Sequence, residues 1–137
     1  MHKVQCYQAA HNQDKTQKSV NFIVVFVGGG LGSILRYLMS LLCKNNAFHW
    51  GTLSSNLISS ILLGLLLAFY EKNEKPNDLL YLFVGMGLCG GFSTFSTFSV
   101  ENFLLFKNAH YNLLILNVTL NIFLCFLGIY FGYKWIR

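Results

Sequence analysis

Ten consecutive residues combine a pair of glycines with alternating hydroxyl and phenylalanine side chains. They are residues 90–99, which read GGFSTFSTFS. The stretches on either side are apolar enough to lie in a membrane, where backbone N–H and C=O groups freed from a helix find no water. Such an interruption is stable only where protein or an aqueous cavity takes those groups. The segment therefore predicts an ion or solute site.

Phe95 and Phe98 lie three residues apart, so a helix presents them on one face. The edge of an aromatic ring is electropositive, and two edges can flank an anion. A site without a full positive charge binds weakly enough to release the ion, as conduction requires. Hydroxyl groups nearby could donate hydrogen bonds to the same ion. Spacing alone fits lipid-facing side chains equally well, because the chain has 13 phenylalanines.

Four long apolar stretches surround this segment, at about residues 20–42, 51–70, 79–106 and 111–133. Each reaches the roughly 20 residues that cross a bilayer as a helix. Charged residues make up 11% of the chain, against about 25% in soluble domains. We expect a polar N-terminal tail at residues 1–20 and one four-span domain at 21–137. The third stretch is too long for one straight span, and its surplus coincides with Gly90 and Gly91, which predicts two half-helices.

Basic residues are distributed unevenly between the two predicted sides of the membrane. The N-terminal tail, the loop at 71–78 and the C-terminal tail hold seven of the ten Lys and Arg, whereas the other side has Lys44 and Lys107. This bias predicts that both termini lie in the cytoplasm. The net charge of +5 is then an orientation signal, and it argues against nucleic-acid binding. The four scattered cysteines form no C-x-x-C pair, so neither a zinc site nor a redox motif is indicated.

Small and charged residues mark the first span. Gly28 and Gly32 have the Gly-x-x-x-Gly spacing that lets two membrane helices approach closely. Arg36 follows one turn later. A lone charge in the membrane must reach the interface or face a polar interior. We predict structural roles for all three residues. The residues alone leave open whether the Arg36 side chain reaches the interface or faces a polar interior.

A polar stripe runs along the second span. Thr52, Asn56 and Ser60 recur at intervals of four, which places them on one helix face. An asparagine amide cannot satisfy all its groups on its own helix. The stripe predicts a pore lining or a polar interface. Asn117 and Asn121 repeat this spacing in the fourth span.

Motifs in several spans resemble, in order, those of the Fluc/CrcB fluoride channels. Residues 90–99 with Glu101 resemble the family's third-span signature, residues 28–37 (GGGLGSILRY) its first, and residues 51–56 (GTLSSN) its second. Asn117-Val118 is a weaker match in the fourth. The resemblance covers about residues 22–132. It implies an all-α integral membrane protein with four transmembrane helices and a broken third helix, forming an antiparallel dual-topology dimer.

By this resemblance the chain is no enzyme but a channel with two pores per dimer. It lets fluoride leave the cytoplasm passively across the bacterial plasma membrane, with fluoride and membrane lipid as its partners. The implied pore residues are Phe95, Phe98, Asn56, Thr94, Ser96 and Thr97. The backbone carbonyls of Gly90 and Ser93, from both subunits, are the implied ligands of a structural sodium ion at the dimer centre. Structural roles fall to Arg36, Gly28, Gly32 and Thr52.

Three alternatives stay open from the residues themselves. The seven-to-two charge bias is unusual for a protein inserted in both orientations, so a heterodimer with an oppositely biased paralogue competes with the default homodimer. A proton-coupled drug exporter is also four-span, but it needs a buried carboxylate in the first span, which carries only Arg36. In a non-conducting assembly subunit, the polar stripes would only hold helices together.

Overall fold

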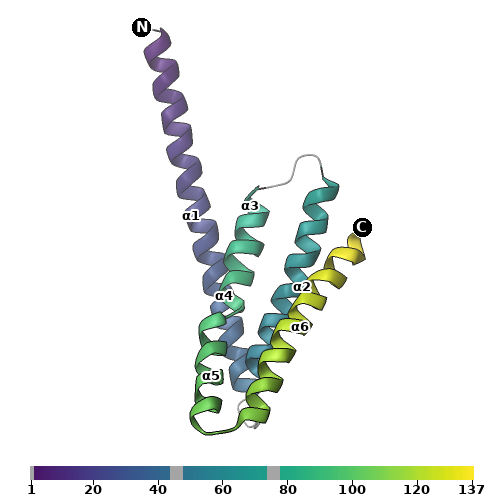
Figure 1. Cartoon of the computed structure of the whole chain (residues 1–137). Coiled ribbons are helices and arrows are strands. Elements are labelled where there is room, and N and C mark those ends of the chain that lie inside the picture. The colour runs from purple at the N-terminus through teal and green to yellow at the C-terminus, as the bar shows by residue number, and fades with distance from the viewer. Residues whose placement is uncertain (1, 44–47, 74–77) are drawn as a thin grey trace.

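The computed structural model describes residues 2–43, 48–73 and 78–137, with residues 2–14 as backbone only. The described residues form α1 (His2–Leu42), α2 (Trp50–Lys72), α3 (Asp78–Leu80), η1 (Tyr81–Cys89), α4 (Gly90–Phe92), α5 (Phe95–Lys107) and α6 (Tyr111–Ile136). η1 has the wider turns of a π-helix. Figure 1 shows both termini at the same end of the bundle, with α1 extending beyond the other helices.

Four helical segments are long and apolar enough to cross a membrane. They are Lys15–Leu42, Trp50–Lys72, Asp78–Lys107 and Tyr111–Ile136. The prediction of an all-α chain with four membrane-length helices is confirmed. The first segment begins inside the stretch predicted as a polar tail, because α1 continues as helix through those residues.

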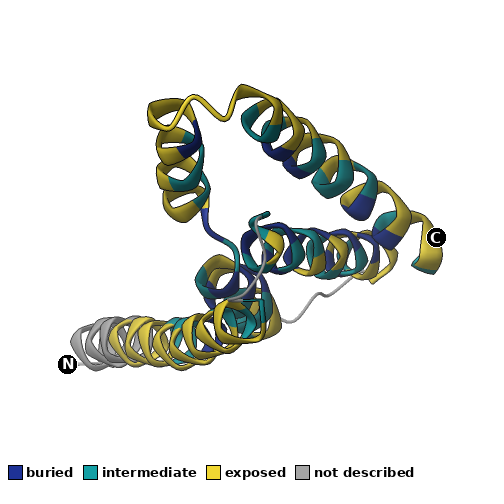
Figure 2. Cartoon of the chain, turned by 90° about the horizontal axis from the view of Figure 1, so that it is seen from below, coloured by how far each residue is buried: buried dark blue, intermediate teal, exposed yellow. Residues whose placement is uncertain are grey.

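The distribution of side chains is the reverse of that in a soluble protein. Large apolar side chains face outward, and Phe26 and Trp135 are 80% and 88% exposed. The fully buried positions include Ser55, Ser59 and Asn117. Figure 2 shows exposed residues on the outer faces of the helices and buried ones toward their neighbours. Lipid tails cover apolar side chains as well as protein does, so close packing and polar contacts must hold these helices together.

Glycines bring the helix backbones into contact at two crossings. In α1, a Cβ on Gly28 would lie 2.5 Å from the carbonyl oxygen of Phe83, and one on Gly32 would lie 2.8 Å from the backbone nitrogen of Phe92. Between α2 and α6, Gly64 faces the backbone of Ile129 and Tyr133, and Gly132 faces that of Ile61 and Leu65. No larger residue fits at these four positions without moving a helix. These two crossings hold α1 against η1 and α4, and α2 against α6.

The third segment leaves helical geometry at Ser93 and Thr94. Ser93 has φ −73° and ψ 156°, and Thr94 has φ −152° and ψ 117°. The interruption expected at Gly90–Ser93 falls at the end of that range and continues into Thr94, because Gly90 and Gly91 lie in the helical turn of α4. Gly91 is required there for close approach, since a Cβ on it would overlap the carbonyl oxygen of Gly29. The interruption falls instead where a threonine can begin the next helix.

Candidate ion pathway at the interrupted third segment

Side chains accept the hydrogen bonds of two backbone N–H groups beside the interruption, those of Thr94 and Thr97. The N–H of Thr94 donates to the side-chain oxygen Oδ1 of Asn56 on α2, at 2.8 Å. Thr94 also caps α5, because its hydroxyl oxygen accepts the N–H of Thr97 at 3.2 Å. The same hydroxyl donates to Oγ1 of Thr97 at 3.0 Å and lies 3.2 Å from Oγ of Ser96. Thr94 is 6% exposed, so these bonds replace water within the protein.

Asn56 begins a series of side-chain amides that crosses three helices. Its Nδ2 donates to Oδ1 of Asn121 on α6 at 3.1 Å. Nδ2 of Asn121 donates to Oδ1 of Asn117 at 3.1 Å, and Nδ2 of Asn117 donates to Oδ1 of Asn102 on α5 at 3.1 Å. Nδ2 of Asn102 donates to the backbone carbonyl of Phe98 at 2.8 Å. Sequence reasoning missed Asn102. Its position four residues after Phe98 was the available signal, whereas its bond to Asn117 depends on how α5 packs beside α6.

A cavity of about 270 Å³ lies beside the interruption, between α2, α5 and α6. Phe98 and Asn56 both line it, although they come from different helices. Its full lining is Asn56, Ser60, Ser93, Thr94, Phe95, Phe98, Asn121, Ile122 and Cys125. We call it the phenylalanine cavity. Its residues supply aromatic rings, hydroxyl groups and side-chain amides, and ring edges, hydroxyl groups and amides can replace the hydration of an anion.

The predicted pore residues do not all face this cavity to the same degree. The ring centroids of Phe95 and Phe98 are 5.8 Å apart, with an angle of 44° between the rings. Phe98 is half-buried, whereas Phe95 is 79% exposed and lies largely outside the single chain. Ser96 is exposed and is not part of the lining. Thr97 lines a different cavity.

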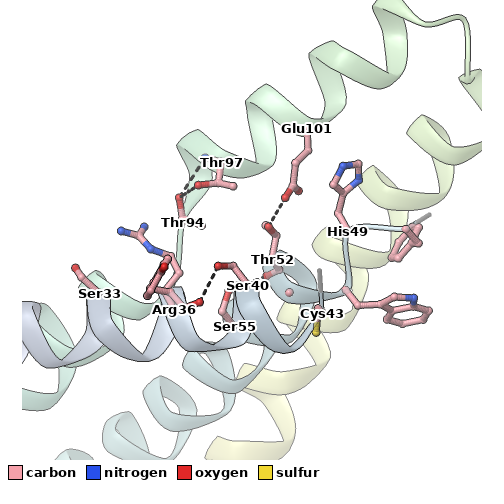
Figure 3. A pocket seen from close by; sticks show the side chains of 14 residues that line it. Ser33, Arg36, Ser40, Cys43, His49, Thr52, Ser55, Thr94, Thr97 and Glu101 are labelled. Atoms are coloured by element: carbon pink, nitrogen blue, oxygen red, sulfur yellow. Dashed lines mark hydrogen bonds between the residues drawn. The ribbon is translucent and has the colours of Figure 1, made fainter. Parts of the chain in front are cut away.

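This second cavity has a volume of about 590 Å³ and lies between α1, the start of α2 and α5. We call it the vestibule (Figure 3). Arg36 lines it from α1, together with Ser33 and Ser40. Thr94 lines both the vestibule and the phenylalanine cavity. The interruption therefore lies between the two cavities.

One carboxylate lines the vestibule. Oε1 of Glu101 accepts a hydrogen bond from the Thr52 hydroxyl at 2.5 Å, which explains why α2 has a threonine at this position. Within the described residues, the buried atoms Oε2 of Glu101 and Nδ1 of His49 have no hydrogen-bond partner. Figure 3 shows Glu101, Thr52 and His49 beside one another at one end of the vestibule.

The predicted metal ligands are backbone oxygens beside the interruption. In a continuous helix the N–H of Thr94 would donate to the carbonyl of Gly90, four residues earlier. It donates to Asn56 instead. Gly90 is exposed and Ser93 is half-buried, so both lie at the surface of the single chain. Oxygen atoms of this kind suit a hard cation, and a second copy of the chain could add its own.

Comparison with known proteins gives a match over nearly the whole membrane domain. The model of the family described as CrcB-like protein, Camphor Resistance (CrcB), matches residues 23–133. The chain belongs to the CrcB family. The resemblance drawn from the sequence motifs is confirmed. The match runs from α1 to α6, so the interruption, the amide series and both cavities lie within the part that defines a CrcB protein.

Curated relatives of this CrcB chain carry a functional name. The "Fluoride-specific ion channel FluC 2" of Bacillus licheniformis is 42% identical over 117 residues, covering 83% of this chain and 88% of the relative. The "Fluoride-specific ion channel FluC" of Gloeothece citriformis is 41% identical over 118 residues, covering 81% and 95%. That of Elusimicrobium minutum is 38% identical over 117 residues, covering 82% and 90%.

Proposed function

We propose that this chain is a fluoride-selective channel that lowers cytoplasmic fluoride by passive efflux across the plasma membrane. The observation that carries the proposal is the position of Phe98 and Asn56 on one cavity beside the interruption. The names of the relatives support fluoride as the ion. Transport needs only the electrochemical gradient, without catalysis or ATP.

The path runs from the vestibule past Thr94 into the phenylalanine cavity. Its groups offer weak hydrogen bonds and ring edges, so an anion is partly dehydrated without being trapped. The remaining N–H of the Asn56 amide and the edge of the Phe98 ring face the ion. Thr94 and Thr97 add hydroxyl groups on the vestibule side. Ser96 and Phe95 complete the path from the exposed face of α5.

The working unit in this proposal is an antiparallel dual-topology dimer in which the third helix acts as two half-helices. Several of the predicted site residues are exposed within the third membrane-length segment, which supports a protein partner at this face. They are Gly90, Phe95, Ser96 and Thr97. The carbonyls of Gly90 and Ser93 from both copies would hold a structural sodium ion at the dimer centre. The default is a homodimer in a bacterial inner membrane, and a paralogue of opposite charge bias is the other possible partner.

The substitution Phe98→Ile tests this function. It replaces a ring edge with an aliphatic group of similar hydrophobicity, so we expect fluoride efflux from liposomes to be abolished while the dimer is retained. Phe103→Ile is the matched control, because Phe103 is 63% exposed on the same helix and lines neither cavity. Unchanged efflux in the Phe98 variant would remove this residue from the pore.

The same liposomes separate the other functional classes. Fluoride-selective current without a proton gradient supports a channel. Exchange of cations driven by protons would indicate an exporter instead. The absence of any flux from correctly folded protein would indicate an assembly subunit, in which the polar stripes serve only helix packing.

A further inference from the structure

The amide series described above has a fixed direction. Its first donor is the backbone N–H of Thr94, which can only donate, and its last acceptor is the backbone carbonyl of Phe98, which can only accept. Between these ends stand the side chains of Asn56, Asn121, Asn117 and Asn102. Each accepts with its oxygen and donates with its nitrogen. Turning any one amide around would place two donors or two acceptors in contact, so the two backbone ends set the orientation of all four side chains.

The series is closed in space as well as fixed in direction. Thr94 is the N-cap of α5 and Phe98 lies in its first turn, so the hydrogen bonds leave the start of α5, pass through α2 and α6, and return to that turn. The interior of the series is shielded from water, because Asn117 is 0% and Asn121 is 5% exposed. A buried amide that loses a partner is destabilising, so a break at one link affects the remaining ones.

Apolar burial within the single chain contributes little to the position of α5. Leu105 is the buried residue of this helix, and it lies two turns beyond Phe98. Phe95, Val100 and Phe103 are exposed by 79%, 58% and 63%. Within the single chain, the first turn, which carries the predicted pore phenylalanines, is therefore oriented more by hydrogen bonds than by apolar packing.

The series also acts on the amide that faces the phenylalanine cavity. Asn56 uses one lone pair to accept from Thr94 and one N–H to donate to Asn121, which leaves one N–H for a ligand. An amide whose oxygen accepts a hydrogen bond becomes a stronger donor through its nitrogen, and successive links polarise one another in the same direction. The free N–H of Asn56 is thus better prepared for an anion than that of an isolated asparagine.

We infer that Asn102 and Asn117, which line neither cavity, are positioning residues that hold the Phe98 turn and the Asn56 amide in their conducting geometry. This inference rests on the proposed fluoride function for its effect on transport. The series of bonds itself does not depend on that function. A measurement on the protein without fluoride can therefore test it separately.

The test uses Asn102→Ala and Asn102→Ser in the full-length protein. A serine hydroxyl can still donate to the carbonyl four residues earlier, but it cannot reach Asn117, so only the link between helices is lost. This second variant is the more conservative one should the alanine variant fail to fold. Asn112→Ala is the matched control, since Asn112 is exposed at the start of α6. The first readout is the ¹⁵N–¹H side-chain resonance of Asn56, assigned from its loss in Asn56→Gln.

We expect both Asn102 variants to shift the Asn56 resonance and to lower fluoride efflux by about tenfold, as the loss of a partner from a buried amide implies. Asn112→Ala should change neither. An unmoved Asn56 resonance would overturn the inference, and so would a moved resonance with full efflux, because the series would then be purely structural. If the unmodified protein conducts no fluoride while its Asn56 resonance still responds to Asn102, the proposed function fails and the coupled series stands.

Discussion

The contact between α2 and α6 gives a sharp test of how this protein is held together. A Cβ placed on Gly132 would overlap the carbonyl oxygen of Ile61 and lie 3.1 Å from the backbone nitrogen of Leu65. One turn earlier on the same face, a Cβ on Gly128 would meet side-chain atoms first, Cδ1 of Leu57 at 3.0 Å and Cγ1 of Ile61 at 3.2 Å. The backbone of α2 cannot move aside locally, whereas the Leu57 side chain can rotate and that of Ile61 needs to shift by only a few tenths of an ångström.

The expected free energies follow from this difference. Overpacking a well-packed site costs about 1–3 kcal/mol. Replacing glycine by alanine within a helix recovers about 1 kcal/mol. For Gly132→Ala the cost lies at the upper end of its range, since two helix backbones must separate, and we expect a net loss of about 2 kcal/mol. For Gly128→Ala the two terms nearly cancel.

The assay is a reversible titration from mild detergent into sodium dodecyl sulfate, followed by circular dichroism. It measures the free energy of unfolding for each variant against the unsubstituted protein. Equal free energies for Gly132→Ala and Gly128→Ala would refute the reasoning, because the two positions differ in whether backbone or side chain opposes the added methyl group. A Gly132→Ala variant as stable as the parent would mean that α2 and α6 are not in backbone contact.

Two further predictions concern the vestibule and the cation. Thr52→Val removes the hydroxyl that donates to Glu101, so we expect the free energy of unfolding to fall by about 1.5–3 kcal/mol. Thr52→Ser keeps a hydroxyl and should therefore keep most of this stabilisation. Equal losses for the two variants in the same titration would mean that the hydrogen bond contributes nothing. Replacing sodium by N-methyl-D-glucamine in all buffers should lower the melting temperature of the dimer and its fluoride efflux, and adding sodium back should restore both. A dimer equally stable in the two cations would contradict a structural sodium ion held by the carbonyls of Gly90 and Ser93.

The helices and their close contacts could be predicted from the sequence because both depend on local patterns. Apolar length predicted the four membrane-length segments, and the Gly28–Gly32 spacing pointed to the face of α1 that meets η1 and α4. The interruption lies at the end of the expected range Gly90–Ser93 and not at its glycines, because a glycine pair suits two different needs: a non-helical backbone and a close helix crossing. Gly91 serves the second need, which depends on where α1 lies and cannot be read from residues 90–99 alone.

The polar stripes were recognised as stripes, but their connections could not be predicted. Asn56, Asn117 and Asn121 stood out by spacing. Asn102 did not, because one asparagine near the end of an amphipathic segment looks like a solvated residue. Its role depends on the register of α5 against α6, which the intervening turn sets. The two cavities likewise require the mutual placement of α1, α2, α5 and α6.

The connection between α2 and α6 also has consequences for how the chain matures in the membrane. The second helix leaves the ribosome long before the last one, yet its glycine contact and its asparagine partner both belong to α6. Until the final helix inserts, lipid tails cannot accept the hydrogen bond that the Asn56 amide of α2 donates to α6. Insertion of the last helix is therefore the step that gives α2 both its backbone contact at Gly64 and the acceptor for the Asn56 amide.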